Sequence, residues 1–237
     1  MSLATDLNDR LNDVARDWGR SPEYQRYLDT QLTRERAQIV ATQGGLFVRN
    51  RRVCWAYASA TAPLDVKQYI VEHEHEELIR DEYIEGGHYQ LWVQQGEIVG
   101  LTSDEMDNAR PLPTTRAALY SWIHMAQTLP WLDAFSASAI LERTNDNTLF
   151  EGGGHAAQAG KRWREQLGLS WEEVPNFQVH RQADDAHNEG AASVLERHVK
   201  DESDLLRVEA AARECLETYQ VYLVGVAMAM EAIPASS

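Results

Sequence analysis

Apolar side chains recur at helical spacing along almost the whole chain, and no other feature restricts the fold as strongly. Near the N-terminus, Leu7, Leu11 and Val14 follow one another at intervals of four and three residues, so they lie on one face of a helix. Convincing alternation of apolar and polar residues, which marks half-buried strands, is absent, as are internal repeats and long linkers. The pattern predicts an all-α protein.

Capping residues and glycines divide this periodic sequence into segments. Thr33 and Pro130 stand where helices begin, whereas glycines at 86–87, 100 and 152–154 interrupt the pattern. We expect helices over residues 7–18, 23–31, 33–40 and beyond, 65–83, 88–95, 114–127, 130–140, 176–200 and 203–233, and the start of a short helix near Asp104. Neither half of the chain has enough helices to close a core, so we predict a single domain over residues 1–237, a bundle of about seven to nine helices.

The charge balance restricts the partners. The chain has 22 Lys and Arg against 37 Asp and Glu, and this net charge of −15 repels phosphate backbones and anionic lipid. We therefore expect no nucleic acid and no membrane partner. The most apolar stretch, residues 219–233, is too short to span a bilayer and contains Glu231. Cys54 and Cys215 form no disulfide framework and the N-terminus has no signal-peptide layout, so we expect a cytoplasmic protein.

The sharpest local motif is a histidine row near residue 180. His180, Asp184 and His187 are spaced by four and three residues, which places all three on one face of a helix. Imidazole and carboxylate are common ligands for iron, manganese and zinc. The alternative is a solvated acidic face that happens to contain histidines. This segment alone leaves both interpretations open.

A second cluster of acids and histidines covers residues 71–92. It contains two Glu-x-x-His spacings, Glu72 with His75 and Glu85 with His88, which resemble those of di-iron bundles but lie too close together for two separate helices. Most of these acids must be exposed, because so many carboxylates cannot all be buried on one helix. His73 and His75 are two residues apart and face different directions, so we expect both on the surface.

A lone glutamate, Glu142, follows an apolar helical run. By itself such a residue is most often an exposed helix end, unless a nearby metal site needs one more carboxylate.

Together with Glu142, these motifs resemble the haem-oxygenase-like di-iron oxidase and oxygenase family, whose relatives include PQQ synthase, TenA-type thiaminase II and the para-aminobenzoate-forming oxygenases. The resemblance covers roughly residues 24–199. It rests on six residues in order: Glu82, His88, Glu142, His180, Asp184 and His187. Glu85 remains a rival to Glu82 as the first ligand.

The resemblance implies a haem-oxygenase-like fold, two Fe(II) ions held by those six residues, and O2 as co-substrate. Such enzymes are oxidoreductases that act on small metabolites. We expect an amino acid or another carboxylate, with aromatic amino acids included, transformed by C–C or C–N oxidation such as nitrile or alkene formation or by N-oxygenation. The para-aminobenzoate-forming relatives consume one of their own tyrosines, and Tyr24 lies near the matching place. They carry a tyrosine where this chain has Leu141, so we do not transfer that reaction.

Several roles remain open at this stage. Arg116, Arg143 and Arg181 are the arginines nearest the expected ligands in sequence, and each is a candidate for binding a substrate carboxylate. Asp185 and Glu189 are candidates for orienting the histidines. A homodimer is one open arrangement, and the electron donor is unknown.

Two other functions remain alternatives. The first is a metal-free enzyme of the PQQ-synthase or thiaminase type. A thiaminase nucleophile is disfavoured because Cys54 and Cys215 lie near neither cluster in sequence. The second is a non-enzymatic helical interaction domain, which would make the six-residue pattern accidental.

Overall fold

The computed structural model describes residues 2–81 and 83–234, except for the side chains of residues 182–188. Within these residues there is no strand, only an isolated bridge between Arg80 and Glu85. The helices are α1 (Leu3–Gly19), α2 (Pro22–Asp29), α3 (Arg34–Thr61), α4 (Leu64–Leu78), α5 (His88–Ile98), α6 (Ser103–Asp107), α7 (Pro113–Thr128), α8 (Trp131–Arg143), α9 (His155–Leu167), α10 (Pro175–His198) and α11 (Glu202–Glu231).

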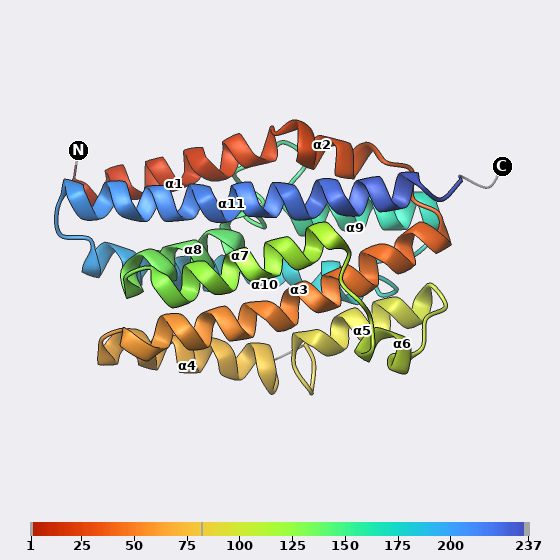
Figure 1. Cartoon of the computed structure of the whole chain (residues 1–237), viewed down its shortest axis with the longest axis horizontal. Helices are drawn as coiled ribbons and strands as arrows, with labels where there is room; N and C mark the ends of the chain where they lie inside the picture. Colours follow the sequence, from red (N-terminus) through yellow and green to blue (C-terminus); the bar gives the residue numbers. More distant parts are fainter. Residues whose placement is uncertain (1, 82, 235–237) are drawn as a thin grey trace.

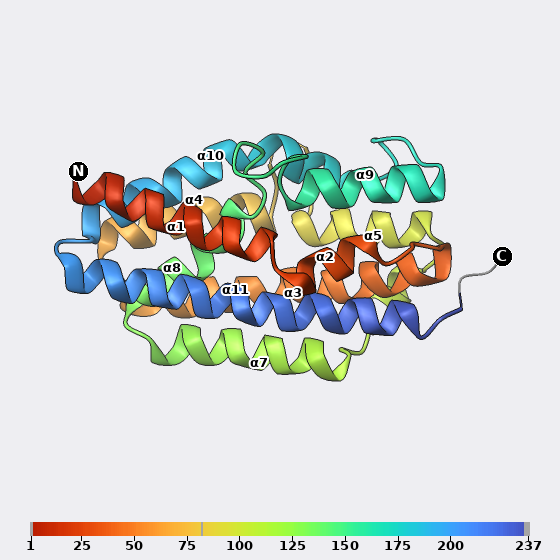
Figure 2. The same cartoon turned by 90° about the horizontal axis from the view of Figure 1, so that it is seen from above.

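The helices form an elongated bundle. Helix α11 runs nearly the full length of the molecule, and α1 and α2 follow one another along it (Figures 1 and 2). Helix α3 packs against α4, α5, α7 and α8, whereas α10 packs against α5, α8 and α9. The two termini lie at opposite ends of the bundle in both views.

Helix α8 is the innermost element of the bundle. All of its residues from Leu132 to Glu142 are buried, because α3, α7, α10 and α11 surround it. Polar groups on such a helix are isolated from water and need partners inside the protein. A carboxylate on α8 is therefore an interior group.

A glycine allows the long helix α3 to pack closely against α5. A Cβ atom on Gly44 would lie 2.4 Å from the ring of Trp92, so only glycine lets the two helices approach this closely. This contact brings the middle of α3 against the segment that contains His88.

The all-α prediction is confirmed, but the chain has more helices than the seven to nine expected. The helix missing from the predicted set is α9. It begins directly after three glycines, and its buried residues are the small Ala156, Ala159 and Gly160 together with Arg162 and Trp163. The segment is polar overall and has only one large apolar residue on its buried face, so it does not stand out as an apolar helical run.

The predicted helix over residues 65–83 is wrong in its last turn. Helix α4 ends at Leu78, and the Asp81 carboxylate accepts the backbone N–H groups of Tyr83 and Ile84, both at 2.8 Å. Local side-chain bonds of this kind compete with helical ones, so the chain turns here instead of continuing.

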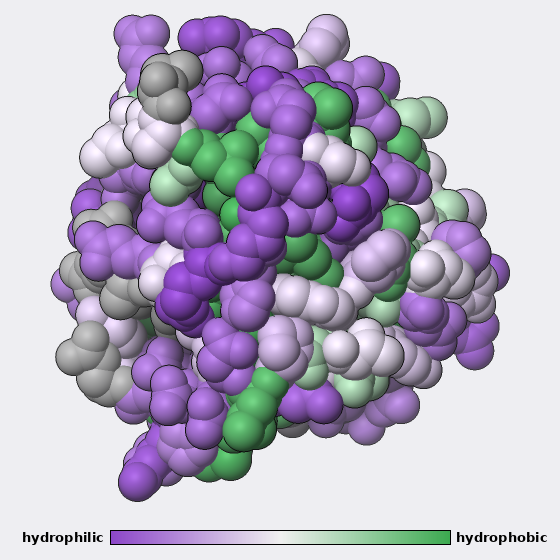
Figure 3. Space-filling model, turned by 90° about the vertical axis from the view of Figure 1, so that its left-hand side faces the viewer, coloured by the Kyte–Doolittle hydropathy of each residue, from purple (hydrophilic) through white to green (hydrophobic). Residues whose placement is uncertain are grey.

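The surface agrees with the acidic composition. The end of the bundle that carries the N-terminus presents mostly hydrophilic residues, interrupted by separate hydrophobic spots (Figure 3). In the described part of the chain, no helix is both long and apolar enough to cross a bilayer.

Candidate metal centre

Helix α4 carries two polar residues on its buried face. Val66, Ile70, His73 and Glu77 are spaced by four, three and four residues, so the apolar stripe of the helix continues into a histidine and a glutamate. His73 is 4% exposed and Glu77 is 5% exposed. The expectation that His73 is a surface residue was therefore wrong, whereas His75 is exposed as expected.

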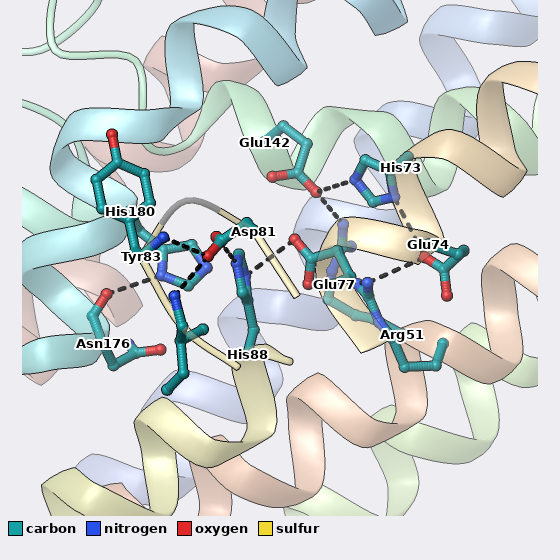
Figure 4. A network of polar contacts seen from close by, with 12 residues as sticks. Arg51, His73, Glu74, Glu77, Asp81, Tyr83, His88, Glu142, Asn176 and His180 are labelled. Atoms are coloured by element: carbon teal, nitrogen blue, oxygen red, sulfur yellow. Dashed lines mark hydrogen bonds and ion pairs between the residues drawn. The ribbon is translucent and has the colours of Figure 1, made fainter. Parts of the chain in front are cut away.

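His88 is held against Glu77 by the turn that precedes it. Gly87 has a φ of +78°, and a Cβ atom there would lie 2.6 Å from the Glu77 carbonyl oxygen, so the loop packs tightly on the end of α4. His88 is the first residue of α5. Its Nδ1 lies 3.1 Å from Glu77 Oε1 and its Nε2 lies 2.8 Å from Asp81 Oδ2 (Figure 4). The imidazole thus sits between two carboxylates.

His180 of α10 completes this group from the opposite side. Its ring stands edge-on to that of His88, with centroids 4.9 Å apart. Its Nδ1 lies 2.8 Å from the backbone oxygen of Asn176 (Figure 4). Because a carbonyl oxygen can only accept, Nδ1 carries the proton, which leaves the lone pair of Nε2 for another ligand.

Glu77, His88 and His180 can hold a metal ion. One ligand atom from each residue lies within 4.8 Å of the others. Two imidazoles and a carboxylate suit iron, manganese or zinc. The backbone bond that fixes the His180 tautomer is typical of metal-binding histidines. The donor set therefore fits a first-row transition metal.

Glu142 lies in the same interior on the last turn of α8. It is 6% exposed, so it is not the exposed helix end that a lone glutamate in this position most often is. Its Oε1 accepts a hydrogen bond from Arg51 Nη2 and lies 3.8 Å from His73 Nε2. Arg51 also donates to the backbone oxygen of Ser138 at 3.2 Å. Glu142 is thus a buried carboxylate with a cationic partner on each side.

The neighbouring carboxylates keep the two histidines on this side charged. Burial alone would lower the pKa of His88, but the charges and hydrogen bonds of Glu77 and Asp81 raise it to about 9. Burial acts in the same direction on His73, where hydrogen bonds to Glu142 and Glu74 raise the pKa to about 9.

The pKa values of the carboxylates shift in the opposite direction, downwards. Burial would raise the pKa of Glu77 and of Glu142, but nearby cations hold both values well below the ordinary one. For Glu77 these are Arg52, whose Nη1 lies 2.8 Å from Oε2, and His88; for Glu142 they are Arg51 and His73. The cluster consists of mutually compensating charges.

The histidines across the interior are neutral. Burial lowers the pKa of His180, and the charge of His88 lowers it further. Burial also lowers the pKa of His155 to about 3. A neutral imidazole is the form that binds a metal or accepts a proton.

A cavity of about 80 Å³ lies beside these groups. Its polar lining includes Glu77, Glu142 and His180, which places the metal cluster and Glu142 on one wall. Its aromatic lining is formed by Tyr27, Phe47, Trp92, Phe177, Tyr219 and Tyr222. The cavity therefore combines an acidic, metal-binding wall with an aromatic one, as expected for a small-molecule site.

The structure brings together part of the expected ligand set. His88 and His180 share a cluster, and Glu142 faces the same cavity. Glu82 lies outside the described residues. Asp184 and His187 fall within α10, but their side chains also lie outside the described part. Glu85, the rival first ligand, is exposed.

Glu77 is the residue that sequence reasoning missed. It is hidden among many acids, most of which are exposed, and it belongs to no Glu-x-x-His pair. The usable signal was the extension of the Val66 and Ile70 stripe by three and then four residues, which predicts His73 and Glu77 on the buried face.

The three arginines considered for substrate binding lie elsewhere. Arg116 is exposed, and Arg143 donates to Asn8 and Asn12, each at 2.6 Å. Arg181 stacks on Trp171 at 4.0 Å. None of the three lines the cavity, whereas Arg51 does.

Glu189 and Tyr24, two further candidates from the sequence, do not line the cavity. Glu189 is exposed, and Asp185 lies outside the described side chains. The hydroxyl of Tyr24 lies 3.3 Å from His155 Nδ1, and it is Tyr27, one turn further along α2, that faces the cavity.

The arrangement of helices matches solved structures with a haem-oxygenase-like fold. A domain of unknown function with this fold from Shewanella denitrificans has a TM-score of 0.78 at 17% identity, covering 100% of this chain and 97% of that one. A CADD-like protein of unknown function from Nostoc punctiforme has a TM-score of 0.75 at 18% identity, covering 98% and 99%. A TenA homologue from Pseudomonas syringae has a TM-score of 0.64 at 14% identity, covering 92% and 90%. At these identities the likeness defines the fold.

The family is defined by sequence. A family model described as iron-containing redox enzyme matches residues 47–220, and the chain belongs to this family. The matched range contains Glu77, His88, Glu142 and His180. No curated protein sequence matches the chain.

Proposed function

We propose that this protein is an O2-dependent, non-haem di-iron oxidase or oxygenase that acts on a small amino acid or carboxylate. The observation that carries the proposal is the cluster of buried Glu77 and His88 with half-buried His180, in which the His180 tautomer presents Nε2 as a ligand. Membership of an iron-containing redox family supports iron as the metal.

In this proposal Glu77, His88 and His180 hold one iron. Glu142 lies on the same cavity and provides a carboxylate for the second, together with Asp184 and His187 of the sequence motif. Glu82 remains a further candidate from the sequence. When bound, iron supplies the dioxygen chemistry that amino-acid side chains lack.

The chain's own residues prepare this site. The backbone oxygen of Asn176 fixes the orientation of His180, and Arg52 balances the charge of Glu77. His88 must release a proton before it can bind a metal. Its Nε2 lies 2.8 Å from Asp81 Oδ2, which can accept the N–H of the neutral ring and so orient His88. The aromatic wall limits the access of water to the reacting groups.

The metal-free alternative lacks a suitable thiol nucleophile. Burial raises the pKa of Cys54 to about 11 and that of Cys215 to about 12, so both thiols stay protonated at neutral pH. This disfavours a thiaminase-type reaction that depends on either cysteine.

Oxygen consumption tests the proposal. The protein is loaded with Fe(II) without oxygen and mixed with oxygenated buffer, with and without a mixture of the common amino acids, while dissolved O2 and the amino acids are followed by electrode and mass spectrometry. We expect O2 uptake that the mixture accelerates and the loss of at least one amino acid. Glu85→Gln, which changes an exposed carboxylate on the loop before His88, is the control and should behave as the wild type does. Iron-loaded protein without O2 uptake would contradict the proposal, and failure to bind iron would favour the metal-free alternative.

A further inference from the structure

A buried arginine faces the cavity from the middle of α3. Arg51 is 8% exposed and borders the cavity beside Phe47, with its guanidinium carbon 5.9 Å from the ring centroid. Among the described residues that line the cavity, it is the only lysine or arginine. A permanent charge in such a place is costly unless it is paired, so its partners define its role.

Both protein partners of Arg51 lie on one face of α8. Nη1 donates to the Ser138 carbonyl oxygen and Nη2 donates to Glu142, four residues further along the helix. A guanidinium has five N–H donors arranged as a planar fork, and these two bonds occupy two of them. The side facing the cavity can therefore bind an additional acceptor.

Metal binding would strengthen the need for that acceptor. If Glu142 binds iron as proposed, the metal takes up much of the negative charge that now balances Arg51. A buried guanidinium that loses part of its counter-charge is destabilised, because a buried charge needs a partner. A carboxylate ligand in the cavity restores the balance, because it binds arginine through two parallel, charge-assisted hydrogen bonds.

Asn176, one turn before His180 on α10, also lines the cavity and offers a complementary group. The side-chain oxygen of Asn176, a residue 4% exposed, has no hydrogen-bond partner among the described residues. An orphaned buried acceptor is rare in folded proteins and is usually satisfied by a ligand or by water. It can accept from an amine or a hydroxyl group, and the aromatic residues nearby suit an apolar or aromatic body.

We propose that Arg51 binds the carboxylate of the substrate, and that the substrate is a small carboxylic acid with an apolar or aromatic body and an amine whose N–H groups reach Asn176. This inference rests on the proposed function, because it names the substrate class of that site. Aromatic amino acids have these features. Arg51 is thus a binding residue for substrate as well as the structural partner of Glu142.

Three related probes test this assignment by calorimetry on the full chain loaded with Fe(II) in the absence of oxygen. L-phenylalanine has both polar groups, 3-phenylpropionate lacks the amine, and L-phenylalaninamide lacks the carboxylate. We expect the amide to bind at least about tenfold more weakly than the amino acid, the usual effect of losing a charged hydrogen-bonded pair. We expect 3-phenylpropionate to bind with intermediate affinity.

Substitutions then identify the residues responsible for the preference for the acid over the amide. Arg51→Met is expected to lower the affinity for L-phenylalanine to that for the amide while leaving amide binding unchanged. Arg51→Lys keeps the charge but not the fork, and should retain part of the preference, which also covers the case in which Arg51→Met does not fold. Asn176→Leu should lower the affinity for L-phenylalanine but not the affinity for 3-phenylpropionate. Arg49→Met, on the same helix and stacked on Tyr89 at 4.8 Å, is the control and should bind all three as the wild type does.

The outcomes separate this inference from the proposed function. Iron bound at the expected stoichiometry, with acid and amide binding equally well or with no probe binding at all, overturns the role of Arg51 and leaves the iron site standing. A preference for the acid that survives Arg51→Met also overturns it. If iron does not bind, the proposed function fails, and the acid-against-amide comparison on the metal-free chain still tests Arg51.

Discussion

Two pairs of histidines lie around the same cavity, and their environments differ sharply. His73 and His88, on α4 and α5, are surrounded by carboxylates and have a pKa raised to about 9. His155 and His180, on α9 and α10, have lowered pKa values, and that of His155 is about 3. Burial acts in the same direction on all four.

The neighbours therefore decide the charge. His155 packs between aromatic rings, with centroids 5.6 Å from Tyr24 and 5.9 Å from Tyr219, whereas His88 lies between Glu77 and Asp81. On the acidic side, a metal ion can replace the positive charge that protonated His88 now places beside the carboxylates. The aromatic side is neutral and suits an organic molecule. The cavity thus has an acidic side with charged histidines and an aromatic side with neutral ones, and His180 reaches from the neutral side to the metal cluster. The predictions below test this difference in charge.

Removing a carboxylate from the acidic side should have the largest effect. Glu142→Ala leaves Arg51 buried without its counter-charge, and we expect the free energy of unfolding of the metal-free protein to fall by about 3–5 kcal/mol. Urea denaturation followed by circular dichroism measures this. Glu85→Ala, an exposed glutamate, should change the value by less than about 0.5 kcal/mol. Equal effects of the two changes would contradict the buried charge network.

Iron binding should depend strongly on pH. His88 is protonated in the metal-free protein up to a pH of about 9, so a metal ion must displace that proton. We expect the apparent affinity for Fe(II) to rise by about tenfold per pH unit for each proton released between pH 6.5 and 9. Anaerobic titrations in two buffers of different ionisation enthalpy count the protons. Affinity that does not change with pH would show that His88 is neutral before metal binds.

The metal-free protein should lose stability in alkali. The folded pKa values of His73 and His88, about 9, exceed the ordinary value of 6.5, so the folded state binds more protons between these limits. Their contribution is complete below pH 6.5 and is lost as the pH rises through 9. We expect the melting temperature to fall over this range, and to fall less in His88→Gln. A variant that follows the wild-type curve would argue against the raised pKa of His88.

The aromatic side should show a smaller effect with the opposite sign. Because the folded pKa of His155 is lowered to about 3, the unfolded chain takes up a proton below pH 6.5 that the folded chain does not. Stability should therefore decline as the pH falls from 6.5 to about 4.5, where the carboxylates begin to titrate as well. His155→Phe keeps an aromatic ring in place and should flatten this part of the melting curve. An unchanged slope would show that His155 is not the cause of the decline in stability over this pH range.

The division of the cavity also shows what the sequence could predict. The α-helical class and the roles considered for His88, Glu142 and His180 came from periodicity and from a family resemblance in residue order. The buried state of His73 and Glu77 did not, because their dense acidic surroundings suggested a solvated helix. The apolar residues that mark the buried face of α4 lie one and two turns earlier, at Ile70 and Val66.

The surroundings of Arg51 were harder to predict. Arg51 lies in an arginine-rich stretch of α3, and its partners Ser138 and Glu142 are about ninety residues away in sequence. Only the packing of α3 on α8 brings them together. The loop over residues 79–87 was likewise hidden, because its geometry depends on side-chain bonds of Asp81 and on the close approach of Gly87 to α4.

Counting bound iron tests the central claim most directly. The chain is loaded with Fe(II) without oxygen, desalted, and assayed for iron per protein, in parallel with His88→Ala and with His75→Ala, an exposed histidine on α4. We predict about two irons per chain in the wild type and in His75→Ala, and the loss of at least one in His88→Ala. Wild-type protein that retains no iron, or His88→Ala that retains as much as the wild type, would contradict a metal centre built on Glu77, His88 and His180.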